Sequence, residues 1–346
     1  MVFYLMFRIR ISHKRGYRMS ARTISWKRYV LSRVVVALPM ILLAIVINFT
    51  LIHIAPGDPI LLLTGEFAPT PEFKRAIEAK FGLDKPLWEQ LFLYISHIFH
   101  GDLGESIRFR EPVTSLIADR IGATLLLMGT SISISLVIGV LLGVIASRNP
   151  YSLVDNTATL FSLFGWSLPI FWLAQLLMIA FSINLGWFPV SGMRSLRENF
   201  TGFAYILDVL WHLFLPALTI ALLRMAQTFR LTRASMLEVM GQDFILTARS
   251  KGLRERTVLL KHALKNALRP IITTTGVQFG TMLVGATMTE IVYSWPGMGR
   301  LIYEAVLARD YPVLMGVYLI IVILVIFANF ITDIVYAMYD PRVRYT

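Results

Sequence analysis

Long apolar runs separated by shorter polar segments dominate this sequence. Several runs exceed the ~18 residues that distinguish a transmembrane helix from a helix of a soluble core. About 22 residues of α-helix reach about 33 Å, enough to cross the ~30 Å hydrocarbon layer of a bilayer. The pattern predicts an all-α integral membrane protein with six transmembrane helices, at about residues 29–54, 123–146, 157–185, 205–240, 271–292 and 313–339.

Proline and glycine inside two of these runs predict bends. The third run contains Gly165 and Pro169, residue types that commonly accompany a kink. The fourth run contains Pro216. We expect the fourth run to bend at this proline and to continue as one helix out of the membrane towards Met240.

Glycines four residues apart recur in the second and fifth runs, as the pairs Gly139 with Gly143 and Gly276 with Gly280. Lipid provides no hydrophobic drive between helices, so small residues that let two backbones approach favour helix association. We interpret both pairs as close packing sites, with a flexible gate hinge as the alternative.

The composition agrees with a membrane protein. Of 346 residues, 56% are hydrophobic and only 16% are charged, whereas soluble domains carry roughly 25% charged residues. There is no cysteine, which excludes disulfides and thiolate metal sites. The net charge of +12 would suit a nucleic-acid partner. In a membrane protein we interpret it as positive-inside asymmetry, with no nucleic acid bound.

The basic residues predict the orientation. Between the fourth and fifth runs, nine basic residues stand against Glu238, Asp243 and Glu255. The tail formed by residues 1–28 is also basic, and so is the C-terminal end. The positive-inside rule therefore puts both termini and this segment on the cytoplasmic side of the cell membrane. The role of the tail stays open, and Met19 is an alternative start. Residues 29–346 are expected to form one transmembrane domain.

The loop at about residues 55–120 is then extracellular, and its sequence predicts helices. Thr70-Pro71-Glu72 is typical of a helix start, and Gly82 of a helix end. Lys85-Pro86 starts a second helix that His100-Gly101 ends. The apolar face of this second helix is expected to dock on the spans or to lie at the membrane interface, and it consists of Leu91, Phe92, Ile95, Ile98 and Phe99.

The cytoplasmic segment at about residues 241–269 has two amphipathic stretches with a glycine between them. Phe244, Ile245 and Ala248 are expected on one side of a short helix that begins near Asp243. Gly252 interrupts it, as glycine does where a helix stops or turns sharply. Apolar residues then recur at helical spacing to about residue 268. The pattern predicts two helices that lie in the cytoplasm and meet at Gly252.

This segment resembles the cytoplasmic loop of permeases of binding-protein-dependent ABC importers. Their general pattern is Glu-Ala-Ala, three residues, Gly, nine residues, Ile-x-Leu-Pro, and only Ala248, Gly252 and Leu264 match it literally. The dipeptide/oligopeptide version fits far better, because Thr-Ala-Arg-x-Lys-Gly-Leu stands at 247–253 and His-Ala-Leu-x-Asn-Ala at 262–267. Further segments typical of this subfamily extend the resemblance over nearly everything after the tail: 53–59, 81–86, 101–104, 169–172, 294–300 and 340–342.

The resemblance implies a type I importer fold with a cytoplasmic coupling helix. It also implies half of a translocation path for di- or oligopeptides, beside a second homologous permease. Further implied partners are two ATPase subunits, which carry ATP and Mg, and an extracellular or periplasmic substrate-binding protein. The residues expected to couple the permease to the ATPase are Asp243, Phe244, Ile245, Leu246, Thr247, Ala248, Arg249, Ser250, Lys251, Gly252 and Leu253.

Missing motifs agree with a transport subunit that is not itself an enzyme. The sequence has no Gly-Lys dipeptide and therefore no phosphate-binding P-loop. It has no His-Glu-x-x-His motif, and its histidines show no metal-ligand spacing, so we expect no directly bound cofactor or metal. Polar residues near or within the spans are expected to bond between helices or at the interface, and the residues of the translocation path stay unassigned: Asn48, His212, Glu290, Asn329 and Asp333.

Other functions remain open at this stage. The same subfamily imports nickel complexes, glutathione and oligosaccharides. A secondary transporter would usually show more spans, an internal repeat and charges at the bilayer midplane, none of which is clear in this sequence. A membrane enzyme would need a reactive constellation of side chains, and none is present. A channel or a passive scaffold would have no use for the two helices joined at Gly252.

Overall fold

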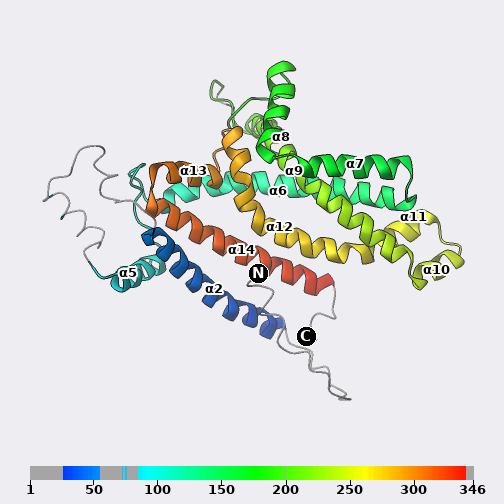
Figure 1. Ribbon diagram of the computed structural model, residues 1–346, viewed down its shortest axis with the longest axis horizontal. Helices are drawn as coiled ribbons and strands as arrows, with labels where there is room; N and C mark the ends of the chain where they lie inside the picture. The colour runs from blue at the N-terminus through cyan, green and yellow to red at the C-terminus, as the bar shows by residue number, and fades with distance from the viewer. Residues whose placement is uncertain (1–25, 55–71, 73–74, 76–84, 199, 340–346) are drawn as a thin grey trace, which may run out of the picture.

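The computed structural model describes residues 26–54, 72, 75, 85–198 and 200–339. Within these residues the secondary structure is helical, apart from an isolated β-bridge between Glu105 and Pro112. The long helices run along an elongated bundle, as Figure 1 shows. In chain order the elements are α2 (Trp26–Ile54), α5 (Leu87–Phe99), α6 (Val113–Arg148), α7 (Leu153–Ser167), α8 (Ile170–Leu177), the π-helix η1 (Met178–Asn184), α9 (Phe203–Met240), α10 (Asp243–Ser250), α11 (Glu255–Thr257), the π-helix η2 (Val258–Ala263), α12 (Leu264–Val292), α13 (Met298–Ala308) and α14 (Tyr311–Tyr339).

Several helices are long and apolar enough to cross a membrane. In the described residues these are α6, α9 and the Tyr311–Thr332 part of α14. The pair formed by α7 and α8–η1 passes the same test as one broken span. Helices α2 and α12 coincide with the first and fifth predicted spans. The prediction of an all-α membrane protein is confirmed, whereas the number of six spans stays a prediction.

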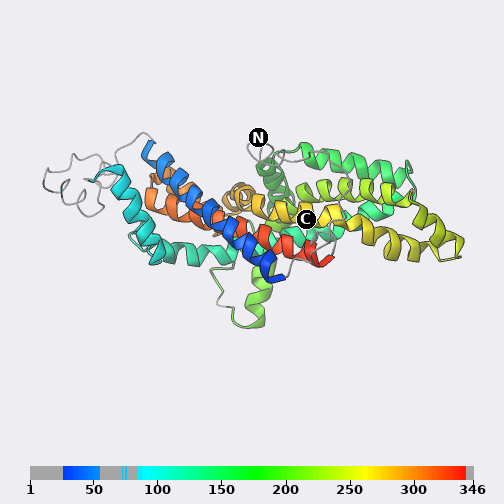
Figure 2. The ribbon, with the colours of Figure 1, turned by 90° about the horizontal axis from the view of Figure 1, so that it is seen from below.

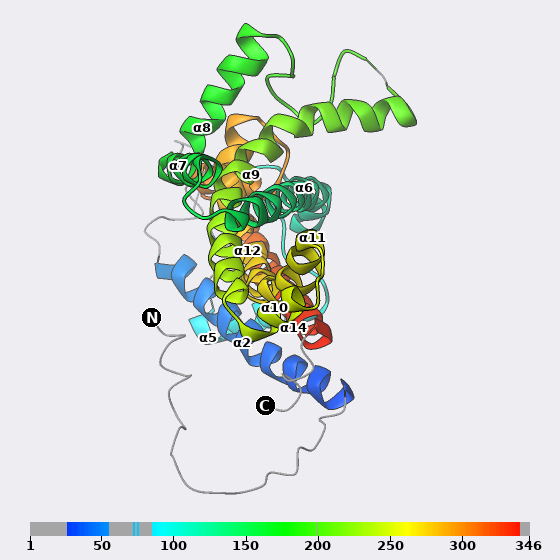
Figure 3. The same cartoon turned by 90° about the vertical axis from the view of Figure 1, so that its right-hand side faces the viewer.

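The third predicted span is bent far more sharply than an ordinary kink. Helix α7 ends at Ser167, α8 begins at Ile170, and the two axes differ by 108°. Leu168 precedes Pro169 and has the extended backbone that a following proline favours, with φ −84° and ψ 134°. Helix α9 continues unbroken through Pro216, as predicted. Figure 3 shows the beginning of α9 turned away from the rest of the helix.

Helices α6 and α9 pack closely because two glycines leave room for threonines. A Cβ atom on Gly139 would lie 2.8 Å from Cβ of Thr228, and one on Gly143 would lie 2.6 Å from Cβ of Thr232. A Cβ atom on Gly276 would likewise lie 2.5 Å from Cβ of Thr332 on α14. Real side chains do not approach so closely, so the predicted packing role is confirmed at these three glycines.

Short helices lie at both ends of the bundle. Figure 1 shows α10 and α11 at one end and α5 with α13 at the other. Helix α5 begins after Pro86 and ends before His100, as predicted, and Gly101 has φ +78°. The predicted helix start at Thr70-Pro71-Glu72 and its end at Gly82 lie largely outside the described residues, as does the tail 1–25. Helix α6 begins at Val113, so the end of the predicted 55–120 loop is already helical.

Candidate functional site

The predicted ATPase-coupling segment forms a separate short helix at the end of the bundle. Helix α9 ends at Met240, and α10 starts at Asp243 after the extended residue Gln242. Asp243 lies in the first turn of α10, where a carboxylate interacts favourably with the helix dipole. Figure 3, which looks at this end of the molecule, shows α10 and α11 near the middle of the end surface. Several residues of the segment are therefore exposed at this end of the molecule.

The two sides of α10 have different surroundings. Ile245 is completely buried and Ala248 nearly so, and both pack with Val144 and Met236 of the neighbouring long helices. Phe244 is 39% exposed and Leu246 is 66% exposed. The prediction that Phe244 shares one side of the helix with Ile245 and Ala248 is wrong, because Phe244 is exposed and the other two are buried. The predicted role of Ile245 in coupling to an ATPase stays a prediction. Ile245 is part of the internal core, so only Phe244 and Leu246 present apolar surface outward from α10.

Gly252 adopts a backbone conformation that other residues avoid. It follows the C-cap residue Lys251 and has φ +71°, and its N–H donates to the Arg249 carbonyl at 2.9 Å. This is the left-handed conformation that glycine commonly supplies just after a helix. No other atom lies within 4 Å of the position that a Cβ would take. Backbone conformation, and not lack of space, accounts for glycine at this joint.

An ion pair connects the two sides of the joint. Arg249 of α10 donates from Nη2 to Oε1 of Glu255 at 2.7 Å and from Nε to Oε2 at 3.3 Å. The hydrogen bond from Arg249 is the main reason that the pKa of Glu255 lies below its ordinary value. Both side chains are partly exposed, so the pair contributes about 0–1 kcal/mol. The pair therefore orients the joint more than it stabilises the fold.

The helix that follows Gly252 does not end near residue 268, where the sequence predicted its end. It begins with α11, passes through η2 and continues as α12 to Val292, with Pro270 inside the helix. Ala263, Ala267 and Ile271 are all buried. The same side of the helix is thus buried before and after Pro270, and tertiary packing keeps the helix continuous despite the lost backbone hydrogen bond. Only Leu253 and Arg254 therefore separate Gly252 from one continuous helix that ends at Val292.

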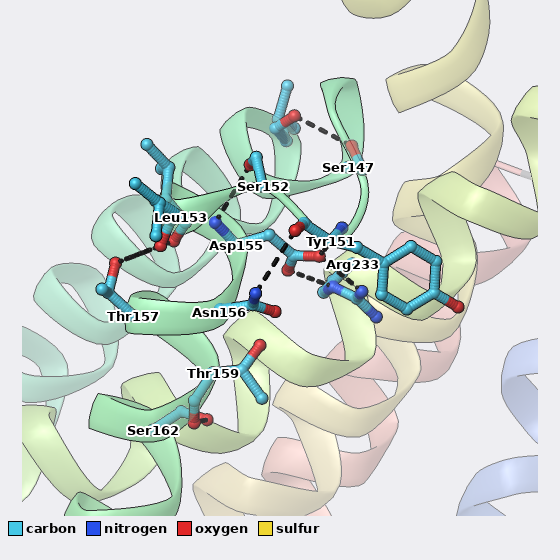
Figure 4. A network of polar contacts seen from close by, with 12 residues as sticks. Ser147, Tyr151, Ser152, Leu153, Asp155, Asn156, Thr157, Thr159, Ser162 and Arg233 are labelled. Atoms are coloured by element: carbon cyan, nitrogen blue, oxygen red, sulfur yellow. Dashed lines mark hydrogen bonds and ion pairs between the residues drawn. The ribbon is translucent and has the colours of Figure 1, made fainter.

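A polar network at the same end fixes α7 to α9, as Figure 4 shows. The guanidinium of Arg233 donates from Nε to Oδ1 of Asp155 at 2.5 Å and from Nη2 to Oδ2 at 2.6 Å. The N–H of Tyr151 donates to Asp155 Oδ2 at 2.8 Å, and Ser152 caps the first turn of α7. The Asp155 side chain is only 1% exposed. Such a two-pronged charged pair has a defined geometry, so α7 and α9 are held in one arrangement here.

The polar residues singled out near the spans are mostly internal partners. Asn48 donates to the Met315 carbonyl at 3.0 Å, and His212 Nδ1 lies 2.8 Å from the Asp208 carbonyl oxygen. Asn329 is exposed, and the side chain of Asp333 lies outside the described residues. The prediction of interhelical bonding is therefore confirmed for Asn48. For His212 the partner lies on its own helix, which the prediction did not foresee.

Glu290 has the most elaborate of these environments. Its fully buried carboxylate accepts from Thr124 Oγ1 at 2.7 Å and from the N–H of Arg300 at 2.9 Å. The Thr124 hydroxyl oxygen in turn accepts from the N–H of Met298 at 2.7 Å. A Cβ on Gly297 would collide with the Glu290 carboxylate. Glu290 and Thr124 thus cap the N-terminus of α13 and join α6, α12 and α13.

No group of three or more metal-ligating side chains is present among the described residues. The polar clusters described above are satisfied by internal hydrogen bonds, and none of them combines a nucleophile with an adjacent base. The notable geometry is an exposed short helix, α10, at one end of a helical bundle.

Comparison with known proteins decides the family. A family model described as binding-protein-dependent transport system inner membrane component matches residues 139–345. The chain belongs to this family. A second model, described as binding-prot-dependent transport system membrane comp, N-term, matches residues 26–128 of the permease. Together the two models cover both the helices around α5 and the coupling segment.

Relatives match the permease over almost its whole length. It is 37% identical over 335 residues to the dipeptide transport system permease protein DppB of Escherichia coli (strain K12), covering 92% of this chain and 99% of that protein. It is 39% identical over 318 residues to the oligopeptide transport system permease protein AppB of Bacillus subtilis (strain 168), with the same two coverages. The di/tripeptide transport system permease protein DppB of Pseudomonas aeruginosa (strain UCBPP-PA14) is 40% identical over 313 residues, covering 86% and 93%.

Solved structures share the fold. An inward-facing structure of the MetNI methionine ABC transporter matches with a TM-score of 0.52 and 19% identity, covering 65% of this chain and 96% of that chain. The expected type I importer permease fold is therefore confirmed. The permease is a transport component of the inner membrane.

Sequence reasoning missed the two ion pairs at the end of the bundle that carries α10. Arg249 and Glu255 flank Gly252 with opposite charges, a signal that local sequence carries. Asp155 and Arg233 are 78 positions apart, and no local pattern connects them. Only the close packing of α7 on α9 brings that second pair together.

Proposed function

We propose that this permease forms half of the translocation path of a di- or oligopeptide importer and is driven by separate ATPase subunits. The outward side of α10 carries this proposal, because it combines apolar side chains with a glycine joint that leads into α12. In this proposal the Asp243–Leu253 segment docks on an ATPase, while ATP and Mg bind to that subunit. Both termini lie in the cytoplasm, on the same side as α10.

The proposed coupling works through rigid elements. A shift of α10 during ATP binding and release is transmitted across Gly252 and the Arg249–Glu255 pair into the continuous α11–η2–α12 helix. Ile245 and Ala248 pack α10 against α6 and α9, so a shift of α10 also presses on these two helices. Motion of packed helices against each other is a known way of switching between two conformations.

The peptide substrate is supported by the names of the relatives, which transport dipeptides, di/tripeptides or oligopeptides. Other solutes carried by this type of importer, such as nickel complexes, glutathione or oligosaccharides, are the alternatives. We further propose that a second homologous permease completes the path and that an extracellular or periplasmic binding protein delivers the substrate.

A reconstituted importer tests the proposal. The permease is co-expressed with its candidate second permease and ATPases, purified, placed in liposomes and supplied with the cognate binding protein. We expect ATP-dependent uptake of labelled dipeptides and co-purification of the ATPases. Uptake of a nickel complex or a sugar in place of peptides would reject the substrate assignment. Transport without any ATPase would reject the importer mechanism itself.

A further inference from the structure

Helix α5 exposes an apolar stripe at the end of the bundle opposite α10. Trp88, Phe92 and Phe99 are 70%, 70% and 83% exposed. Their spacing of four and seven residues puts them on one side of the helix. The adjoining side packs against the buried cluster that includes Leu103 and Val113. Its partly buried residues are Leu91, Tyr94, Ile95 and Ile98. The predicted apolar face of α5 is thus divided between a docked side and an uncovered stripe.

The remaining side of α5 is mainly polar, because Glu89, Gln90, Ser96 and His97 surround a single apolar residue there, the partly buried Leu93. Gln90 donates from its amide to the Lys85 carbonyl at 2.7 Å, and His97 Nδ1 lies 3.1 Å from Oδ2 of Asp102. At 100° per residue, His97 lies opposite Trp88 on the helix. The stripe itself contains no charged residue. Helix α5 is therefore amphipathic even after its docked side is set apart.

The stripe adjoins exposed apolar surface on α2. Tyr94 of α5 stacks on Phe49 of α2, with ring centroids 6.2 Å apart. Figures 1 and 2 both show α5 beside the end of α2. Helix α2 packs on α14 and α5 and exposes apolar side chains such as Leu43 and Ile47. In a membrane component these side chains of α2 are expected to contact the bilayer. Helix α5 lies beside the end of α2, at the edge of this apolar surface.

We propose that α5 is an interfacial anchor in the outer leaflet, with Trp88, Phe92 and Phe99 inserted at the boundary between headgroups and acyl chains. Trp concentrates at this depth of a membrane, and interfacial helices commonly carry Trp, Phe and Leu on the side that enters it. A helix with an uncharged apolar side and a polar opposite side lies in the interface plane. The stripe has no charge with which to select a protein partner, which favours phospholipid as its occupant. The assignment of this anchor to the outer leaflet depends on the orientation proposed above.

The absence of cysteine makes a labelling test direct. Single cysteines replace Phe92 or Phe99 in the stripe, and His97→Cys provides the matched control on the polar side of the same helix. Each variant carries a nitroxide label in the assembled importer, in phospholipid nanodiscs, after its transport has been checked. Collision of the label with oxygen, which partitions into lipid, is compared with collision with a neutral water-soluble nickel chelate.

We expect the labels at Phe92 and Phe99 to favour oxygen and the label at His97 to favour the chelate. Labels at both stripe positions that favour the chelate would place the stripe in water, and labels shielded from both reagents would place it against protein. Either result overturns the anchor. Sidedness is measured separately: His97→Cys in intact cells must react with a membrane-impermeant thiol reagent. Failure of that reaction would reject the proposed orientation. The collision data would still decide whether the stripe contacts lipid.

Discussion

Arg249 and Glu255 face each other across Gly252, so one ion pair spans the point where α10 turns into the helix that becomes α12. The left-handed backbone at Gly252 sets the direction of the turn, and the pair limits how far the turn can open. The two features are close in sequence, and together they connect the exposed helix α10 to a long helix of the bundle.

The first prediction concerns this pair. Glu255→Gln removes the charge and should lower coupling between ATP hydrolysis and transport while changing unfolding free energy by no more than about 1 kcal/mol. The double variant Arg249→Glu with Glu255→Arg should recover part of the coupling. Transport per ATP hydrolysed in liposomes is the measurement. Full coupling in Glu255→Gln would show that the ion pair is dispensable.

The pH dependence of the pair follows from the lowered pKa of Glu255. A carboxyl whose pKa is lower in the folded state stabilises that state above its unfolded value, here 4.5, and loses this contribution as pH falls through the folded pKa. The melting-temperature difference between wild type and Glu255→Gln should therefore stay constant at neutral pH and shrink only in acid. A difference that changed around neutral pH would point to another titrating group.

Gly252 should be sensitive to backbone conformation and insensitive to side-chain size. Gly252→Val forces a β-branched residue into the left-handed region and should abolish coupling while membrane insertion persists. Gly252→Asn should retain much of the activity, since Asn tolerates this conformation. Gly101→Val is the matched control, because Gly101 also has positive φ and open space but lies at the opposite end. Equal activities of Gly252→Val and wild type would reject the joint.

The outward side of α10 should decide ATPase binding. Leu246→Asp puts a charge on exposed apolar surface and should weaken association with the ATPase at least tenfold, equivalent to about 1.4 kcal/mol. Leu196→Asp, on another highly exposed leucine away from α10, should leave association unchanged. The amount of ATPase that co-purifies with each variant measures this. Equal recovery from both variants would exclude Leu246 from the contact.

The Asp155–Arg233 pair should be structural. Asp155→Asn leaves the Arg233 guanidinium without its charged partner, and breaking a buried pair typically costs about 3–5 kcal/mol, with less expected here because Arg233 is partly exposed. Thermal unfolding in detergent should show a clear loss of stability. Asp119→Asn, at an exposed position of α6, serves as the control. A melting temperature unaffected by Asp155→Asn would mean that the network is not needed to hold α7.

The cap of α13 gives a steric prediction. Gly297→Ala places a methyl group against the Glu290 carboxylate and should destabilise the protein severely, whereas Glu290→Gln keeps an acceptor for Thr124 and should be milder. Expression and melting temperature of the two variants give the comparison. Normal stability of Gly297→Ala would show that the Glu290 side chain can move aside without cost.

The sequence by itself determined the elements that depend on local chemistry. Apolar runs predicted the long helices, Pro169 predicted the break in the third span, and Pro86 and Gly101 predicted the limits of α5. Gly252 marked the joint correctly, because its preference for a left-handed backbone is a property of the residue itself. The subfamily motifs around it pointed to the correct family before any geometry was known.

Tertiary structure decided which side of each helix is buried. On α10 it took Ile245 into the core and left Phe244 outside, although both residues are large and apolar. It also kept α12 continuous through Pro270 and brought Asp155 to Arg233. In a membrane protein, sides that face lipid and sides that face protein are equally apolar, so hydrophobic pattern alone cannot distinguish them. The packing of neighbouring helices makes that distinction.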